Sequence, residues 1–150
     1  MAMRRVRNSL SDGHRPSAFT LVELLIVVVI VGILAAVAVP RFSASREKTF
    51  FAAMKTDLKN LVAAQEIYYA GDAYNYAGAA GSDVPGVTGL EFSASQGVGV
   101  TLREVALTGW SADATHSALT SSQMCAVYIG KAAPVAPAQT PGLVTCTGEN

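Results

Sequence analysis

Residues 19–39 read FTLVELLIVVVIVGILAAVAV, an apolar run that ends immediately before Pro40. Its 21 residues would form a helix about 31 Å long, which matches the roughly 30 Å hydrocarbon core of a bilayer. Glu23 is the single ionisable residue of the run. Because a carboxylate is costly to keep in a lipid-length helix, Glu23 marks a functional position, for which a charge partner on another subunit is the natural candidate.

The segment before this run is basic and sets the expected orientation in the membrane. It carries one acidic residue, Asp12, against Arg4, Arg5, Arg7 and Arg15. By the positive-inside rule, the N-terminus stays in the cytoplasm and the rest of the chain is exported. The sequence therefore predicts a single-pass membrane protein with its N-terminus in the cytoplasm.

Two processing routes compete at this end of the chain. A secretory signal would be cut after Ala38, where residues 36–38 fit the small-x-small pattern, and would release a secreted soluble protein. A cut between Ala18 and Phe19 would instead keep the apolar helix. We favour the second route, because the run is longer than the roughly 7–15 apolar residues of a typical signal and the helical pattern continues beyond Pro40.

The sequence Ala18-Phe-Thr-Leu-Val-Glu23, followed by the apolar run, resembles the class III signal of type IV pilins and of their relatives, the type II secretion pseudopilins. The resemblance is strongest over residues 18–69. It implies that a prepilin peptidase cuts before Phe19 and methylates the new amino group with S-adenosylmethionine. Ala18 departs from the glycine that the family prefers, which predicts slower processing.

The resemblance also implies roles in filament assembly for Phe19, Glu23, Gly32 and Pro40. We expect the Glu23 carboxylate to pair with the N-terminal amine of Phe19 on an adjacent subunit, because a buried charge is tolerable only when it is paired. The alternative is that Glu23 snorkels at the membrane interface. Pro40 predicts a kink or local melting, and Gly32 either weakens the helix or permits close helix packing.

Beyond Pro40 the pattern becomes amphipathic, and residues 41–70 continue the helix with one face directed at a small sheet. That apolar face comprises Phe50, Met54, Leu58, Leu61, Gln65 and Tyr68. The polar half, expected toward solvent or neighbouring subunits, carries Arg46, Glu47, Lys48, Lys55, Asp57, Lys59 and Glu66. Gly71 ends the helix.

The remaining chain predicts a loop and then a sheet. Residues 71–97 are rich in Gly, Ala, Ser and Asp and form a loop held by Tyr74, Tyr76, Leu90 and Phe92. Strands are expected at 98–106, 110–116 and 123–129, as an antiparallel meander of three strands with a fourth left open. The fold class is therefore α+β, and this order of helix, loop, sheet and disulfide-closed tail resembles the pilin fold. Its parts are a leader (1–18), a membrane or filament-core helix (19–40), an amphipathic helix (41–70), the loop, and a sheet with a C-terminal tail (98–150).

Both cysteines, Cys125 and Cys146, lie in the exported portion. An oxidising compartment favours their pairing, which would tie the proline-rich tail to the last strand. Closing a loop of about 20 residues contributes roughly 3 kcal/mol in the chain-entropy model. Two free buried thiols are the alternative.

The sequence offers no enzymatic, metal or cofactor site. There is no Gly-x-Ser-x-Gly elbow, and His116, the one histidine outside the leader, is expected at a strand end. The acidic residues lack calcium-loop spacing, and residues 131–150 carry only Glu149, which counts against a calcium-binding pseudopilin. Without the leader, 11 basic residues less four and 11 acidic residues less one leave a net charge of −3, a poor match for nucleic acid.

Together these features predict a structural protein. The resemblance implies a pilin that waits in the inner membrane and then polymerises through its N-terminal helix into a homo-oligomeric helical filament on the cell surface. Such a pilus would serve adhesion, motility or surface attachment, and would need the pilus assembly machinery. The alternatives are a type II secretion pseudopilin, a minor pilin, or the secreted protein cut after Ala38.

Overall fold

The computed structural model describes residues 19–71, 74–79, 81–84 and 87–148. The chain divides into two compact units, Met1–Pro40 and Arg41–Asn150. Ala18, one side of the predicted cleavage site, lies outside the described residues.

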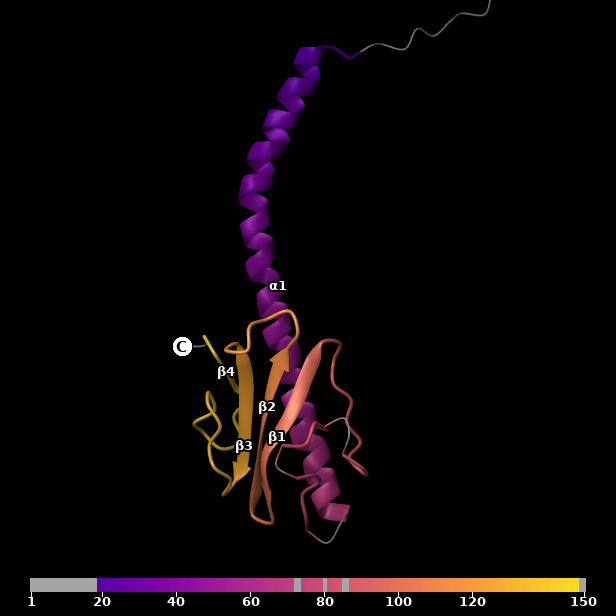
Figure 1. The fold of residues 1–150 in the computed structure, drawn as a ribbon, viewed down its shortest axis with the longest axis vertical. Helices are drawn as coiled ribbons and strands as arrows, with labels where there is room; N and C mark the ends of the chain where they lie inside the picture. Colours follow the sequence, from indigo (N-terminus) through magenta and orange to yellow (C-terminus); the bar gives the residue numbers. More distant parts are fainter. Residues whose placement is uncertain (1–18, 72–73, 80, 85–86, 149–150) are drawn as a thin grey trace, which may run out of the picture. The chain divides into compact units, whose positions relative to one another are not determined.

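A single helix, α1, extends from Leu21 to Gly71 (Figure 1). Its apolar first part can remain helical in lipid because a helix satisfies its backbone hydrogen bonds internally. Pro40 lies inside the helix, so the predicted local melting at Pro40 is not observed. The helix ends at Gly71, as the sequence predicted.

The second unit contains a four-stranded antiparallel sheet in the order β1-β2-β3-β4. Its strands are β1 (Val98–Ala106), β2 (Gly109–His116), β3 (Met124–Gly130) and β4 (Thr145–Cys146). The first three match the predicted meander, and the fourth adds two residues at the edge. The predicted α+β class is confirmed.

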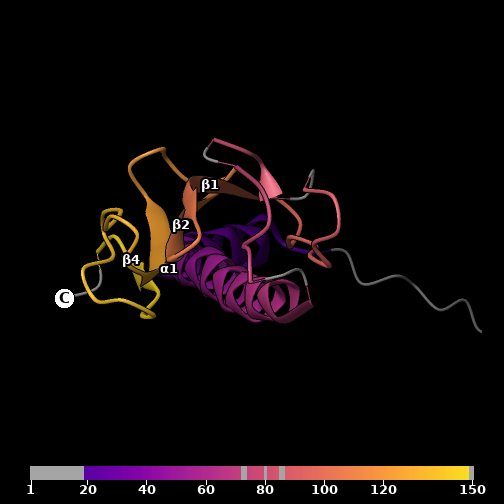
Figure 2. The same cartoon turned by 90° about the horizontal axis from the view of Figure 1, so that it is seen from below.

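The core lies between the C-terminal part of α1 and one face of the sheet, as Figures 1 and 2 show. Met54, Leu58, Leu61 and Gln65 of the predicted apolar face are buried, whereas Phe50 and Tyr68 are half-buried. From the sheet, Trp110 is fully buried in the same cluster. Burial of each large apolar side chain contributes roughly 1.5–3 kcal/mol.

Asp57 corrects one sequence prediction, because it belongs to the buried side of α1 and not to the polar half. Asp57 is only 2% exposed. The carboxylate accepts hydrogen bonds from the amide and hydroxyl groups of Ser95, just before β1. A buried carboxylate is tolerated here because these donors replace water.

Gln65 attaches the loop after α1 to the helix, because its side chain forms two hydrogen bonds with the backbone of Ala77. The amide of Ala77 donates to Oε1 of Gln65 at 2.9 Å, and Nε2 of Gln65 donates to the Ala77 carbonyl at 3.0 Å. Leu90 is buried and helps to hold the loop, as predicted. Tyr74 is 70% exposed and touches only the edge of the Tyr69 ring among the ring contacts described, so it does not anchor the loop in the core.

The tail packs on the outer face of β3. Ala138 packs with Ala126 and Tyr128 of β3, and the Tyr128 hydroxyl donates to the Gln139 carbonyl at 2.9 Å. With α1 on the other face, β2 is shielded on both sides, and its residues 109–114 are all buried.

Both outer edges of the sheet are interrupted. Beyond β3 lies only the two-residue β4, in which Cys146 pairs with Cys125. At the other edge, Asp83 forms an isolated bridge with Thr101, and β1 carries an irregularity between Leu102 and Glu104.

Candidate functional site

The first candidate site is the apolar surface of residues 19–39. Its large apolar side chains, Phe19 included, are 51–81% exposed. Among the described residues, α1 is the one helix long and apolar enough to cross a membrane, with a mean hydropathy of 3.1 over its best 18-residue window. So large an exposed apolar surface requires lipid or other protein around it. This segment is therefore a candidate membrane anchor.

Glu23 is engaged at the start of this helix by Thr20. Oε2 of Glu23 accepts from the Thr20 amide at 2.9 Å and from the Thr20 hydroxyl at 2.7 Å, while the Glu23 amide donates to the Thr20 hydroxyl oxygen at 3.2 Å. This reciprocal arrangement is a capping box, which satisfies backbone donors that a helix start leaves unpaired. The capping box was not predicted from the sequence, although the spacing Thr-x-x-Glu is typical of one.

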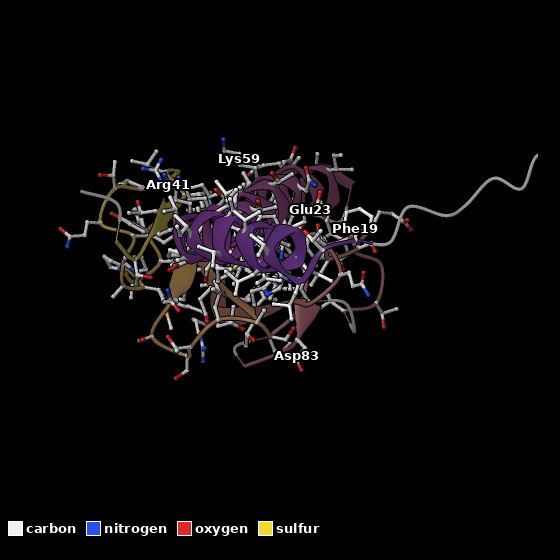
Figure 3. The ribbon with its side chains drawn as sticks, turned by 90° about the horizontal axis from the view of Figure 1, so that it is seen from above. Phe19, Glu23, Arg41, Lys59 and Asp83 are labelled. Atoms are coloured by element: carbon white, nitrogen blue, oxygen red, sulfur yellow. A yellow bond between two sulfur atoms is a disulfide. The ribbon has the colours of Figure 1, made fainter. Side chains whose placement is uncertain are left out.

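The capping box fixes where the Glu23 carboxylate stands. It lies in the first turn, where the positive end of the helix dipole favours a negative charge. Phe19 immediately precedes Thr20 and is exposed, and Figure 3 labels both Phe19 and Glu23 at this end of the helix. Among the described residues, no cation forms an ion pair with Glu23. A cationic partner would therefore have to come from elsewhere.

Gly32 lies on the same surface, farther along the helix. A Cβ built on Gly32 would meet no atom of the chain outside its own helical backbone within 4 Å. The structure therefore places Gly32 open to whatever surrounds the helix, and it does not bring Gly32 and Pro40 together with Glu23 into one cluster.

His116 occupies the end of β2 and is engaged structurally, as predicted. Its ring stacks on Phe50 with centroids 4.1 Å apart, and its Nδ1 accepts from the Ala118 amide at 3.1 Å. The guanidinium of Arg46 lies 5.9 Å from the centre of the Phe50 ring. These contacts join α1 to the end of the sheet.

Asp113 and Arg103 form an ion pair that sequence analysis did not anticipate. The Asp113 carboxylate is 3% exposed and accepts from both Nε and Nη2 of Arg103, the latter at 3.0 Å. The hydrogen bond and the charge of Asp113 raise the pKa of Arg103. Arg103 sits at the irregularity in β1, so alternation along the strand alone could not have revealed the pairing.

Cys125 and Cys146 form a disulfide with Cα atoms 3.9 Å apart, and both are buried. It connects β3 to β4 and so holds the tail on the sheet. In the part of the chain that the structure describes, no three His, Cys, Asp or Glu residues are grouped closely enough to hold a metal ion.

Comparison with known proteins places the similarity at the N-terminus. Residues 14–39 match the family model described as the prokaryotic N-terminal methylation motif. The chain is 46% identical over 55 residues to the type IV major pilin protein PilA of Myxococcus xanthus (strain DK1622), covering 37% of this chain and 25% of that protein. It is 42% identical over 55 residues to the type II secretion system core protein G of Pseudomonas aeruginosa, covering 37% of this chain and 39% of that protein.

The resemblance predicted from residues 18–23 and the apolar run is thus confirmed. The matched segments span only a quarter and about two-fifths of the two relatives.

Proposed function

We propose that this chain is a structural subunit of a type IV pilus-like helical filament. The observation that carries the proposal is the exposed apolar part of α1, which opens with the Thr20–Glu23 capping box inside the N-terminal methylation motif. A surface of this length and hydropathy matches two environments, a bilayer and a bundle of identical helices.

In this proposal, the chain first resides in the inner membrane with its N-terminus in the cytoplasm. Prepilin peptidase then cuts between Ala18 and Phe19 and methylates the amino group of Phe19. The matched motif supports this step, because residues 14–39 include both sides of the junction.

Assembly then replaces lipid by copies of the same chain around residues 19–39. The Glu23 carboxylate pairs with the Phe19 amine of an adjacent subunit, Gly32 provides a surface for close helix contact, and Pro40 marks the end of the packed segment. The exposure of Glu23 and the open surface at Gly32 support these roles. Pairing would convert an isolated charge in an apolar medium into a tolerable one and would reject misplaced subunits.

A pseudopilin of type II secretion is the second candidate, and the match to core protein G favours it. Both candidates use the same N-terminal helix, so they differ in the machinery that polymerises the chain and in whether the filament reaches the cell surface.

The deciding experiment is intact-mass and N-terminal peptide mass spectrometry on protein sheared from the cell surface. We expect an N-terminus at Phe19 with one added methyl group. The same processed form found only in the envelope fraction would favour the pseudopilin. An N-terminus at Val39 would show a cleaved secretory signal and would overturn the filament proposal, including the role of Glu23.

A further inference from the structure

Four aromatic rings connect the core of the unit Arg41–Asn150 to its surface. The ring centroids of Trp110 and Tyr76 are 6.5 Å apart. Tyr69 stacks on Tyr76 at 4.6 Å, and the ring of Tyr74 meets Tyr69 edge-on at 5.5 Å. All three separations lie within the roughly 4.5–7 Å at which aromatic rings are in contact. We call these four rings the aromatic row.

The aromatic row begins at a fully buried residue and ends at an exposed one. Trp110 is fully buried, Tyr76 and Tyr69 are half-buried, and Tyr74 is largely exposed. Tyr74 also has a φ of 60°, a left-handed conformation that is strained for a bulky side chain. An exposed ring gains little from burial, so packing of the core does not account for the way Tyr74 is held against Tyr69.

The buried end of the row has an indole N–H without an acceptor. Nε1 of Trp110 forms no hydrogen bond within the described part of the chain. An indole that loses one electron becomes a radical cation, which ordinarily relaxes by releasing the N–H proton to a base. Because Nε1 has no such base beside it, the radical cation of Trp110 remains a strong oxidant and takes an electron from a neighbouring ring.

The neighbouring ring has an acceptor for its proton. The Tyr76 hydroxyl donates to Oε1 of Glu66 at 3.5 Å. A phenol gives up an electron readily only when its proton leaves at the same time, because the phenol radical cation is very acidic. The carboxylate of Glu66 therefore makes Tyr76 oxidisable, and Glu66 is exposed, so it can pass the proton on to water.

We propose that the aromatic row is a one-electron relay that moves an oxidising equivalent out of the core. In the first step, Tyr76 gives one electron to the Trp110 radical cation and its phenolic proton to Glu66. This step leaves neutral Trp110, a tyrosyl radical and a protonated carboxyl group. Two further steps reduce Tyr76 at the expense of Tyr69 and then Tyr69 at the expense of Tyr74. In each step one electron passes between the rings, and one proton is taken from water and another returned.

The first and last members of the row exchange electrons with the surroundings. Trp110 loses its electron to solvent under ultraviolet light, or to a one-electron oxidant such as the carbonate radical anion, which becomes carbonate. At the other end, a reductant of the ascorbate class supplies one electron and one proton, which return Tyr74 to its phenol. All four rings belong to one subunit, so the relay does not depend on the proposed filament.

The relay would protect the packing around Trp110. This residue is the single tryptophan of the chain, and it shares its core cluster with the disulfide cysteines Cys125 and Cys146. An indolyl radical that persists reacts with oxygen and leaves polar groups on the ring. Polar groups without partners are costly in a core, so rapid reduction of Trp110 preserves the fold.

The test is laser flash photolysis of the full chain in detergent micelles. Light at the long-wavelength edge of the indole absorption ionises Trp110 selectively, and nitrous oxide with tert-butanol removes the ejected electron. In the wild type, we expect the indolyl radical to decay while the tyrosyl radical rises at the same rate, independently of protein concentration. Tyr76→Phe should abolish this rise and prolong the indolyl radical, because phenylalanine keeps the ring but is far harder to oxidise.

Two further variants test the proton acceptor and the exposed end. Glu66→Gln keeps a side chain of the same shape but is a much weaker base, so the tyrosyl radical should rise more slowly. Tyr74→Phe should leave this rise unchanged. Added ascorbate should then remove the tyrosyl radical more slowly than in the wild type, because the radical stays on the half-buried Tyr69 and Tyr76.

Tyr128→Phe is the matched control. Tyr128 is a buried tyrosine outside the aromatic row, and its hydroxyl donates to the Gln139 carbonyl. Its replacement should leave both radical signals as in the wild type. Circular dichroism of every variant before photolysis verifies that the fold is retained.

Several outcomes would overturn the relay. An indolyl radical that decays in the wild type without a tyrosyl rise would do so, as would a wild-type rise in folded Tyr76→Phe. A rise that scales with protein concentration would show transfer between molecules, which is equally incompatible with the proposal. Unchanged reduction by ascorbate in Tyr74→Phe would show that the radical does not leave through Tyr74, and the proposed route would be wrong.

Discussion

The carboxylate of Asp57 in α1 accepts two hydrogen bonds from Ser95, one from its amide at 2.8 Å and one from its hydroxyl at 2.9 Å. The two residues are 38 positions apart, and Ser95 closes the long loop immediately before β1. The pair therefore fixes the point at which the chain enters the sheet. A buried charge-assisted pair of this kind has a measurable share in stability.

Replacing Asp57 by Ala should destabilise the unit Arg41–Asn150 by about 1–3 kcal/mol, because the amide and hydroxyl of Ser95 lose their acceptor. The measurement is thermal unfolding of the full chain in detergent micelles, followed by circular dichroism. Asn60→Ala is the matched control, since Asn60 is exposed on the same helix and should change stability by less than about 0.5 kcal/mol. Equal melting of the two variants would contradict the assigned role of Asp57.

The Glu23→Gln variant should keep normal processing but lower the yield of sheared filaments roughly tenfold or more, because the neutral amide cannot compensate the Phe19 amine of a neighbour. Immunoblotting of the sheared and membrane fractions measures the effect. Thr20→Val removes the hydroxyl of the capping box and leaves the carboxylate, so its effect should be milder. If both variants lose yield equally, helix capping alone explains Glu23, and normal yield with Glu23→Gln would refute the pairing.

Replacing both Cys125 and Cys146 by Ser should lower the stability of the unit Arg41–Asn150 by about 3 kcal/mol, the value expected for closing a loop of about 20 residues. The free energy of unfolding is measured by denaturant titration of the full chain in micelles. Reductant should shift the wild type toward the double variant and leave the variant unchanged. If the reduced wild type, with reduction verified by mass, and the double variant both unfold with the free energy of the oxidised protein, the tail is held by its packing on Tyr128 and not by the covalent bond.

The phenol of Tyr76 gives a prediction at alkaline pH. Burial, followed by the charge of Glu66, raises the pKa of Tyr76 above 10.0. A group whose pKa is raised on folding contributes stability that is complete below its unfolded pKa and is lost as pH rises through the folded value. The wild type should therefore lose stability above pH 10.0, and Tyr76→Phe should lose less.

Two observations would check the assignment of Tyr76. Titration of tyrosinate absorbance should show a late-ionising component that disappears in Tyr76→Phe. Tyr74→Phe is the control, because Tyr74 is largely exposed. An identical alkaline stability profile for Tyr76→Phe and the wild type would contradict the prediction.

The periodicity of apolar residues predicted most of the fold, because helices and strands each have a characteristic repeat. The apolar run and the stripe through Met54, Leu58 and Leu61 predicted α1, and alternation predicted three strands. Asp57 was misplaced because its partner, Ser95, comes from a distant loop that no helical pattern contains. The Arg103–Asp113 pair was missed for a similar reason, since an irregularity in β1 changes the register of the strand.

Some features of the candidate site could likewise be predicted from the sequence, and others could not. The membrane-length surface and the position of Glu23 follow from the order of residues 19–39. Thr20 and Glu23 have the Thr-x-x-Glu spacing of a capping box, so their hydrogen bonds could have been predicted from the sequence. The partner predicted for Glu23 was instead the amine of an adjacent subunit.

The interrupted edges of the sheet have a consequence for the proposed filament, in which subunits would be packed at high local concentration. An open strand edge recruits strands of other molecules, and crowded subunits with such edges convert into cross-β aggregates. Here the edge of β3 is occupied by the disulfide-linked β4, and the edge of β1 is broken by its bridge to Asp83 and by the irregularity after Leu102. In such a filament, many subunits could lie close together without pairing their sheet edges. Contacts between them would then be made by side chains.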